Sequence, residues 1–214
     1  MNLYIISGLG ADAKVFSRIK FNENIKPIHI DWLIPEREED FYHYIGRMAE
    51  KIDTSEPFYL LGYSFGGIVA QEINKLKPAE KVVILGSIRS DKEKSKLIKA
   101  GMLTKIPKLL PESAFGEKAI LTYSYLRKMI EPKNPKVLEY FRVRNAHYLK
   151  WSMEKITEWQ SEETQGVVQI MGDKDIVFPL KNCSPDYIIR NGTHLFPLTH
   201  SAEVSRILRE VLSP

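Results

Sequence analysis

Short apolar runs alternate along this chain with segments in which apolar residues recur at helical spacing, and this alternation restricts the fold more than any other feature. The apolar runs cover residues 3–6, 25–30, 58–61, 82–85, 167–171 and 187–189, and the helical patterns cover 41–52, 68–76 and 204–212. Most of the apolar runs are continuous, which is typical of strands covered on both faces of a parallel sheet. The sequence therefore predicts an α/β domain whose mostly parallel sheet is flanked by helices.

The alternation stops between residues 89 and 165. This segment contains no strand-like run and is interrupted by Pro107, Pro111, Pro132 and Pro135, so it predicts several helices. It holds 16 lysine and arginine residues against 10 aspartate and glutamate residues, a net charge of +6, whereas the rest of the chain is at −2. We interpret residues 1–88 and 166–214 as a core, with residues 89–165 inserted between two of its strands.

Composition restricts the class of protein further. The 214 residues are 43% hydrophobic and 27% charged, which is ordinary for one soluble globular domain. No apolar run approaches the roughly 18 residues of a membrane span, and no basic stripe interleaved with aromatic residues suggests nucleic acid. The first residues lack a basic leader, and the single cysteine, Cys183, cannot form an internal disulfide. We therefore expect a cytoplasmic protein without membrane or nucleic-acid partners.

The most specific motif lies at residues 62–67, which have the sequence GYSFGG. It fits G-x-S-x-G, in which a nucleophilic serine sits on a tight turn between a strand and a helix. Glycines are needed on either side because side chains there would crowd a strained turn. The motif follows the apolar run 58–61 and precedes the helical pattern 68–76, as this turn requires. The context predicts that Ser64 is a nucleophile, not an idle serine in a glycine-rich turn.

A serine hydroxyl needs a base to take its proton, and the chain offers five histidines. His194 lies in a loop just after the run 187–189. In open α/β sheets the functional groups gather at such strand ends, so His194 is the preferred base. His200, directly before the last helical pattern, is the competing candidate, although a cation there would oppose the helix dipole.

The base in turn needs an acid that orients it. Asp173 and Asp175 both follow the run 167–171. Asp175 is the preferred acid because an apolar stretch and Pro179 follow it and restrain its loop. Asp173 stays open as the alternative, although its position beside Lys174 is typical of a surface turn.

Acyl transfer also needs N–H groups that stabilise a developing oxyanion. The backbone N–H of Phe65, at the start of the helix after Ser64, is one candidate. The N–H of Leu9 is the other, because residues 7–12 have the sequence SGLGAD and the two glycines allow a ligand to approach the backbone. This loop lacks both the dinucleotide-binding glycine spacing and the lysine of a P-loop. We therefore expect no nucleotide cofactor and no metal.

Taken together, the loop 7–12, the motif 62–67 and the loops of the acid and the base resemble the α/β-hydrolase superfamily over nearly the whole chain. The order Ser64, Asp175, His194 is that of the superfamily. The resemblance implies that residues 89–165 form a helical cap over the active site. It also implies a sheet of about six strands, because this sequence lacks the antiparallel strands that usually precede the oxyanion strand. Ser7 stands where most relatives have a histidine.

The resemblance implies a serine hydrolase that acts on a small ester or thioester through an acyl-enzyme intermediate, as in small bacterial hydrolases of this build. Its partner would be a small-molecule substrate, and the sequence leaves the oligomeric state open. Two alternatives also stay open. One is a ligand sensor or partner-binding protein that retains the triad. The other is a different reaction on the same fold, such as carbon–carbon bond hydrolysis or perhydrolysis.

Candidates for contacts with the substrate lie beside the nucleophile and in the insertion. Tyr63 and Trp151 are the aromatic candidates. Arg142, Arg144 and His147 could meet an anionic substrate, although a solvated helix face is the simpler explanation of these charges. We expect only two or three aromatic residues of the insertion to touch a ligand, the others packing between helices. The full set is Tyr123, Tyr125, Tyr140, Phe141, Tyr148, Trp151 and Trp159.

Overall fold

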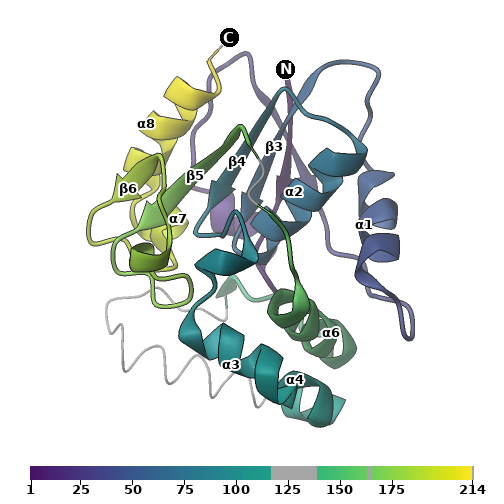
Figure 1. The fold of residues 1–214 in the computed structure, drawn as a ribbon. Helices are drawn as coiled ribbons and strands as arrows, with labels where there is room; N and C mark the ends of the chain where they lie inside the picture. Colours follow the sequence, from purple (N-terminus) through teal and green to yellow (C-terminus); the bar gives the residue numbers. More distant parts are fainter. Residues whose placement is uncertain (117–138, 163–164, 214) are drawn as a thin grey trace.

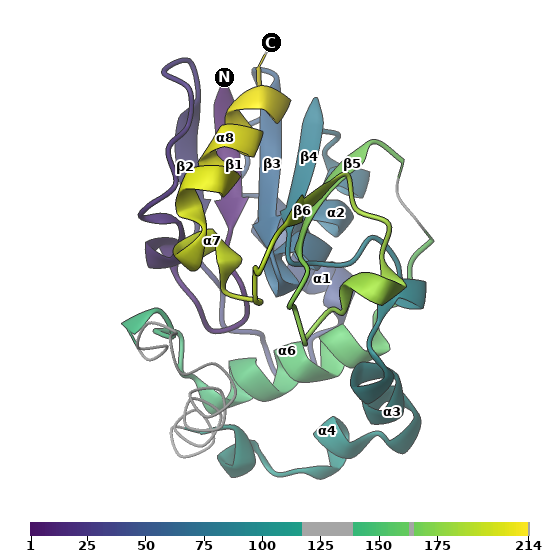
Figure 2. The same cartoon turned by 90° about the vertical axis from the view of Figure 1, so that its left-hand side faces the viewer.

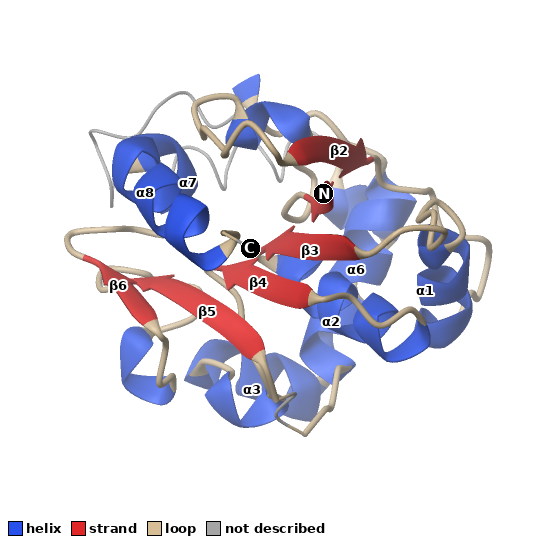
Figure 3. Ribbon diagram, turned by 90° about the horizontal axis from the view of Figure 1, so that it is seen from above, coloured by secondary structure: helices blue, strands red, loops and turns tan. Residues whose placement is uncertain are grey.

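The computed structural model describes residues 1–116, 139–162 and 165–213. Its strands form one sheet of six, in the order β2-β1-β3-β4-β5-β6, and every neighbouring pair is parallel (Figure 3). The strands are β1 (Asn2–Ile6), β2 (Lys26–Ile30), β3 (Phe58–Tyr63), β4 (Lys81–Leu85), β5 (Val167–Gly172) and β6 (Tyr187–Ile189). Each lies within two residues of its predicted bounds, so the predicted sheet is confirmed.

The continuous apolar runs are explained by burial on both faces of the sheet. All six residues of β3 are buried. Along β1, Leu3 and Ile5 join one hydrophobic cluster, whereas Tyr4 and Ile6 join another on the opposite face. Successive side chains of a strand point to opposite faces, so a strand with two covered faces needs apolar residues at every position.

Helices cover each face of the sheet (Figures 1 and 3). On one side lie α1 (Phe41–Ala49) and α2 (Phe65–Leu76), whose buried residues belong to the cluster of Tyr4. On the other side, α7 (Phe196–Thr199) and α8 (Ser201–Val211) belong to the cluster of Leu3. The three helical patterns read from the sequence correspond to α1, α2 and α8.

The segment between β4 and β5 is helical in its described residues. Its elements are η2 (Asp91–Glu93), α3 (Lys96–Thr104), α4 (Ile106–Leu109), η3 (Glu112–Phe115) and α6 (Ala146–Glu158). Figures 1 and 2 show α3, α4 and α6 beyond the carboxyl ends of the strands, the edge from which the loops of the site emerge. The division of the chain into a core and a separate cap at residues 89 and 165 stays a prediction.

The helices of this segment differ in burial. Helix α6 contributes Tyr148, Leu149 and Trp151 to the same hydrophobic cluster as α1 and α2. Helices α3 and α4 have no buried residue, and Leu97 and Leu103 of α3 are 82% and 79% exposed. The segment is therefore joined to the core chiefly through α6. In the part of the chain that the structure describes, no helix combines the length and the apolar character that crossing a membrane requires.

Candidate active site

The turn between β3 and α2 holds Ser64 in a strained conformation, with φ 53° and ψ −120°. A Cβ atom added at Gly62 would lie 2.3 Å from the carbonyl oxygen of Gly66, and one added at Gly66 would lie 2.3 Å from the carbonyl oxygens of Ile6 and Ser7. Both glycines are therefore required by backbone contacts. A side chain at position 62 would crowd the start of α2, as the motif predicts, whereas a side chain at position 66 would collide with the end of β1.

The side chains of Ser64, His194 and Asp175 form a continuous chain of hydrogen bonds. His194 Nε2 lies 2.9 Å from Ser64 Oγ, and His194 Nδ1 lies 2.7 Å from Asp175 Oδ2. A carboxylate only accepts hydrogen bonds, so it holds the proton of the neutral imidazole on Nδ1 and leaves Nε2 free to accept the Ser64 proton. This is the geometry that general-base activation of a serine requires.

Asp175 is itself held firmly. Its side chain is fully buried, and its second oxygen, Oδ1, accepts the backbone N–H groups of Val177 and Phe178 at 2.8 and 3.0 Å. These two hydrogen bonds fix the orientation of the carboxyl group. The loop after β5 therefore presents an oriented acidic side chain to His194.

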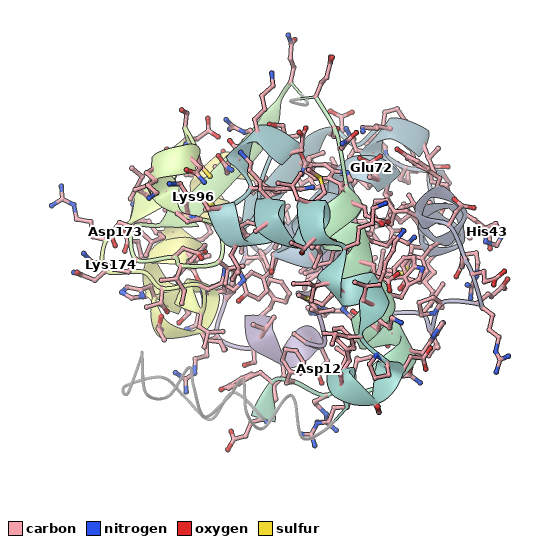
Figure 4. All side chains as sticks on the ribbon, turned by 60° about the horizontal axis from the view of Figure 1, so that its bottom comes forward. Asp12, His43, Glu72, Lys96, Asp173 and Lys174 are labelled. Carbon is pink, nitrogen blue, oxygen red and sulfur yellow. The ribbon has the colours of Figure 1, made fainter. Side chains whose placement is uncertain are left out.

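The two alternatives from the sequence are not part of this chain of hydrogen bonds. His200 occupies the N-cap position of α8 without a capping hydrogen bond from its side chain, and its Nδ1 lies 2.9 Å from Thr199 Oγ1. Asp173 lies beside Lys174 at the edge of the molecule (Figure 4), where its backbone N–H donates to the carbonyl of Ile189. The acid that contacts the base is Asp175.

Aromatic rings enclose the imidazole of His194. The Tyr63 hydroxyl donates to the backbone carbonyl of His194 at 2.9 Å, and the two ring centroids are 5.4 Å apart. The Phe178 ring lies 5.9 Å away on the acid loop. Tyr63 was a candidate substrate contact, but it is buried and its hydroxyl is engaged in holding the histidine loop. Tyr63 therefore stabilises the loop of His194 from a buried position.

The candidate oxyanion donors lie on two loops that meet at Ser64. Phe65 is the first residue of α2, where N–H groups lack partners within the helix. Leu9 lies in a turn in which the N–H of Ala11 donates to the Gly8 carbonyl at 3.0 Å. An added Cβ atom at Gly8 would lie 3.3 Å from Ser64 Cβ, so this turn packs directly against the nucleophile. The structure brings both donor-bearing loops to the same side chain.

The insertion reaches the Leu9 turn through three contacts with Gly10. The N–H of Val143 donates to the Gly10 carbonyl at 2.9 Å, and the Gly10 N–H points to the Tyr148 hydroxyl at 3.4 Å. The Phe141 ring occupies the space that a side chain at Gly10 would fill, with an added Cβ atom only 2.3 Å from it. Of the aromatic residues of the insertion, Phe141 and Tyr148 therefore lie next to the loop of residues 7–12, which carries the candidate oxyanion donor Leu9 and is called the oxyanion loop below.

The structure does not bring the charged candidates of the insertion to the triad. Arg142 Nε lies 3.4 Å from the Asp12 carboxylate, and the Arg142 side chain is 64% exposed. His147 Nδ1 lies 2.8 Å from the Glu112 carboxylate. The Nε–H of Arg144 donates to the carbonyl of Phe141 at 2.9 Å. A role for these three residues in substrate binding stays a prediction.

Trp151 is not placed as a substrate contact. It is buried between α6 and α1, where its indole N–H donates to the Glu39 carbonyl at 2.8 Å and its ring lies 4.5 Å from that of Tyr44. Trp159 is similarly buried, with its indole N–H donating to the Glu72 carboxylate. Among the other aromatic candidates, Tyr123 and Tyr125 lie outside the described residues.

A polar network behind the nucleophile was not predicted from the sequence. The Ser87 hydroxyl donates to the Ser64 carbonyl at 2.7 Å, and the Gln169 side-chain amide donates to the Ser87 carbonyl and to the Glu93 carboxylate, each at 2.9 Å. Ser87 and Gln169 are fully buried. The one signal in the sequence was Gln169 itself, a polar residue in the middle of the apolar strand β5.

Two other sets of reactive side chains lie outside the hydrogen-bonded chain of Ser64, His194 and Asp175. Burial raises the pKa of the Cys183 thiol to about 12, so Cys183 is a poor competitor of Ser64 as a nucleophile. Glu36, Glu39 and His43 form a cluster with possible metal-ligand spacing around the start of α1. Both carboxylate oxygens of Glu39 accept Arg47 at 2.9 and 2.8 Å, which accounts for this buried charge without a metal.

No protein-family model matches the chain, and no curated protein matches it. Among solved structures, MenH from S. aureus is similar with a TM-score of 0.70 and 14% identity, over 99% of this chain and 93% of that chain. A lipase-esterase related protein from Clostridium acetobutylicum is similar with a TM-score of 0.66 and 18% identity, over 99% of this chain and 94% of that chain. The type II thioesterase BorB from the borrelidin biosynthetic cluster is similar with a TM-score of 0.66 and 13% identity, over 99% of this chain and 92% of that chain. The chain has the α/β-hydrolase fold, as the resemblance in its sequence predicts.

Proposed function

We propose that the protein is a serine hydrolase that cleaves a small ester or thioester. The observation that carries this proposal is the chain of hydrogen bonds from Ser64 Oγ through the His194 imidazole to the buried Asp175 carboxylate. The fold adds support, because its neighbours include structures described as esterases and type II thioesterases. Cys183 adds no rival nucleophile, since its thiol is protonated at neutral pH.

The first half of the reaction forms an acyl-enzyme. His194 Nε2 takes the Ser64 proton while Ser64 Oγ attacks the substrate carbonyl carbon. The N–H groups of Leu9 and Phe65 stabilise the negative charge that develops on the carbonyl oxygen. Asp175 stabilises the imidazolium. As the tetrahedral intermediate collapses, His194 gives its proton to the departing alcohol or thiol, and the acyl group stays on Ser64.

The second half uses the same groups in the same order. His194 takes a proton from water, the resulting hydroxide attacks the acyl carbon, and the same two N–H groups hold the second oxyanion. The collapse of that intermediate releases the carboxylic acid and returns a proton to Ser64 Oγ. No cofactor enters the balance of either half.

The proposal is tested by labelling and by turnover. A fluorophosphonate probe is expected to label the wild type at Ser64, and short-chain nitrophenyl esters or acyl thioesters are expected to be hydrolysed. Ser64→Ala should abolish both signals, whereas Cys183→Ala should retain both. A wild type that neither labels nor hydrolyses any of these substrates contradicts the proposal, as does a Ser64→Ala variant with undiminished turnover.

The same experiment separates the alternative functions. Negligible turnover combined with tight ligand binding that survives Ser64→Ala would favour a sensor or partner-binding protein. Labelling of Ser64 without hydrolysis of any ester or thioester would favour another reaction, such as carbon–carbon bond hydrolysis or perhydrolysis. The structure holds no separate observation in favour of either, so ester or thioester hydrolysis is our conclusion.

A further inference from the structure

The direction of the Leu9 N–H is determined by the carbonyl of the preceding residue. The Gly8 carbonyl and the Leu9 N–H belong to one peptide unit, and no peptide bond in the described structure is cis. In a planar trans peptide the C=O and N–H vectors point in opposite directions. Whatever holds the Gly8 oxygen on one side of the loop therefore aims the Leu9 N–H to the other side.

Two donors hold the Gly8 oxygen. One is the N–H of Ala11, at 3.0 Å, which belongs to the same turn. The other is the indole N–H of Trp32, at 3.1 Å, which comes from the segment after β2. Trp32 is 8% exposed, so water does not replace this hydrogen bond freely. Trp32 is thus the contact that ties the orientation of this peptide to the rest of the domain.

The same indole ring also contacts the second candidate donor residue. The rings of Trp32 and Phe65 are stacked, with centroids 5.3 Å apart and planes inclined by 12°. The Trp32 ring also lies near the insertion, with its centroid 5.7 Å from that of Tyr148 in α6. One side chain therefore connects the Leu9 turn, the start of α2 and the insertion.

We propose that Trp32 is a positioning residue for the oxyanion hole, which fixes the peptide that carries the Leu9 N–H relative to the start of α2. This inference rests on the proposed function. Trp32 does not touch the substrate in this scheme. It acts through the Gly8 carbonyl and the Phe65 ring, and sets the spacing of the two N–H groups before the substrate arrives.

Trp32→Phe removes the indole N–H and keeps an aromatic ring beside Phe65. Loss of a whole oxyanion donor typically lowers kcat by about 10² to 10³-fold. Because the Ala11 N–H still holds the Gly8 oxygen, we expect a smaller loss, about tenfold in kcat, with KM changed less than about twofold. This split is expected because the oxyanion forms in the transition state and the tetrahedral intermediate, and is absent from the bound substrate.

Trp151→Phe is the matched control. Trp151 is also buried and also donates its indole N–H to a backbone carbonyl, that of Glu39, but this carbonyl is not part of the oxyanion loop. Both variants lose one hydrogen bond of the same kind from the same hydrophobic cluster. We expect similar decreases in Tm, with kcat decreased only in Trp32→Phe. Equal kcat values for the two variants would overturn the proposal.

A readout that needs no turnover separates this inference from the proposed function. In a ¹⁵N–¹H correlation spectrum, the Leu9 amide signal is expected to shift in Trp32→Phe and to stay unchanged in Trp151→Phe. An inert wild type together with this shift contradicts the hydrolase, and supports only that Trp32 orients the peptide that joins Gly8 and Leu9. A Leu9 signal that is the same in both variants overturns the positioning role, whatever the activity of the wild type.

Discussion

The nucleophile elbow and the helical insertion meet at the same site but are held in place in different ways. At the elbow the contacts join backbone to backbone, and added Cβ atoms at Gly62 and Gly66 would both lie 2.3 Å from carbonyl oxygens. The insertion is held by side chains of α6 and by the contacts of its residues 141–143 with Gly10. Its helices α3 and α4 contain no fully buried residue, and Ile98 of α3 is only partly buried against the core. Substitutions should therefore be severe throughout the elbow and position-dependent in the insertion.

The largest difference in kcat is expected between alanine variants of two histidines, His194 and His200, that are six residues apart. His194→Ala removes the base that contacts Ser64, and kcat should fall by at least about 10³-fold. His200→Ala removes a capping residue whose ring contacts only Thr199 among the described hydrogen bonds, and kcat should stay within about twofold. Steady-state kinetics on one ester measures both. Equal losses in the two variants would show that the site was assigned to the wrong histidine.

The steric demand of the elbow can be measured with two glycines in different settings. Gly62→Ala brings a methyl group against the Gly66 carbonyl and should lower the free energy of unfolding by about 3 kcal/mol or more. Gly46→Ala places the same methyl group in the middle of α1, where no atom beyond the adjacent residues and the helix's own backbone lies within 4 Å. That variant should gain about 0.5 to 1 kcal/mol from helix propensity. Urea unfolding gives both values, and a tolerant Gly62 would remove the contrast on which the comparison rests.

Two leucines of the insertion test whether its anchoring is local. Leu149→Ala creates a cavity where α6 joins the core, and the expected loss of stability is about 2 to 4 kcal/mol. Leu103→Ala truncates a side chain of α3 that is 79% exposed, and its effect should stay within about 0.5 kcal/mol. Thermal or urea unfolding compares the two. A large effect at Leu103 would mean that α3 packs against something in solution.

The smallest effect concerns pH and Lys94, a buried lysine directly after η2 whose ammonium group contacts the end of α6. Lys94 Nζ donates to the carbonyls of Thr157 and Trp159, and burial lowers the pKa of Lys94 to about 8. Between about pH 8 and pH 10.5 the unfolded chain keeps a proton that the folded protein releases. The contribution of this group to the free energy of unfolding therefore rises with pH across that window.

Lys94→Met removes this titration. Relative to the variant, the wild type should gain about 1 to 2 kcal/mol of stability between pH 8 and pH 10. Lys51→Met, at an exposed lysine just after α1, serves as the control and should track the wild type at every pH. The measurement is urea unfolding at a series of pH values. A Lys94→Met curve parallel to that of the wild type would contradict the assigned pKa shift.

The parts of the site that the sequence predicted share a local cause. Ser64 stands out because the elbow needs glycines at fixed distances along the chain, and Asp175 and His194 each follow a strand directly. These are short-range rules, so they can be read without knowing the fold. In the structure His194, and not His200, lies beside Ser64, and Asp175, and not Asp173, contacts His194. The catalytic roles of these residues stay predictions.

The parts that the sequence did not predict depend on distant contacts. Tyr63 and Trp151 are aromatic candidates for substrate contacts, but both are buried. Tyr63 donates a hydrogen bond to the His194 carbonyl, and Trp151 donates one to the Glu39 carbonyl. Gln169 lies in the middle of β5 and Ser87 lies just after β4, so they become partners only when these two strands pair. No local pattern carries such information, because each contact joins residues that are dozens of positions apart.

The sequence by itself determined the parallel sheet, the elbow and the candidate triad, because apolar periodicity and glycine spacing are properties of neighbouring residues. Only the tertiary structure decided how the oxyanion loop is oriented. Its Gly8 carbonyl accepts from Trp32, and its Gly10 is enclosed by residues of the insertion. Hydrogen bonds and ring contacts of this kind depend on where separate elements meet in space, and that is set by the packing of the whole chain.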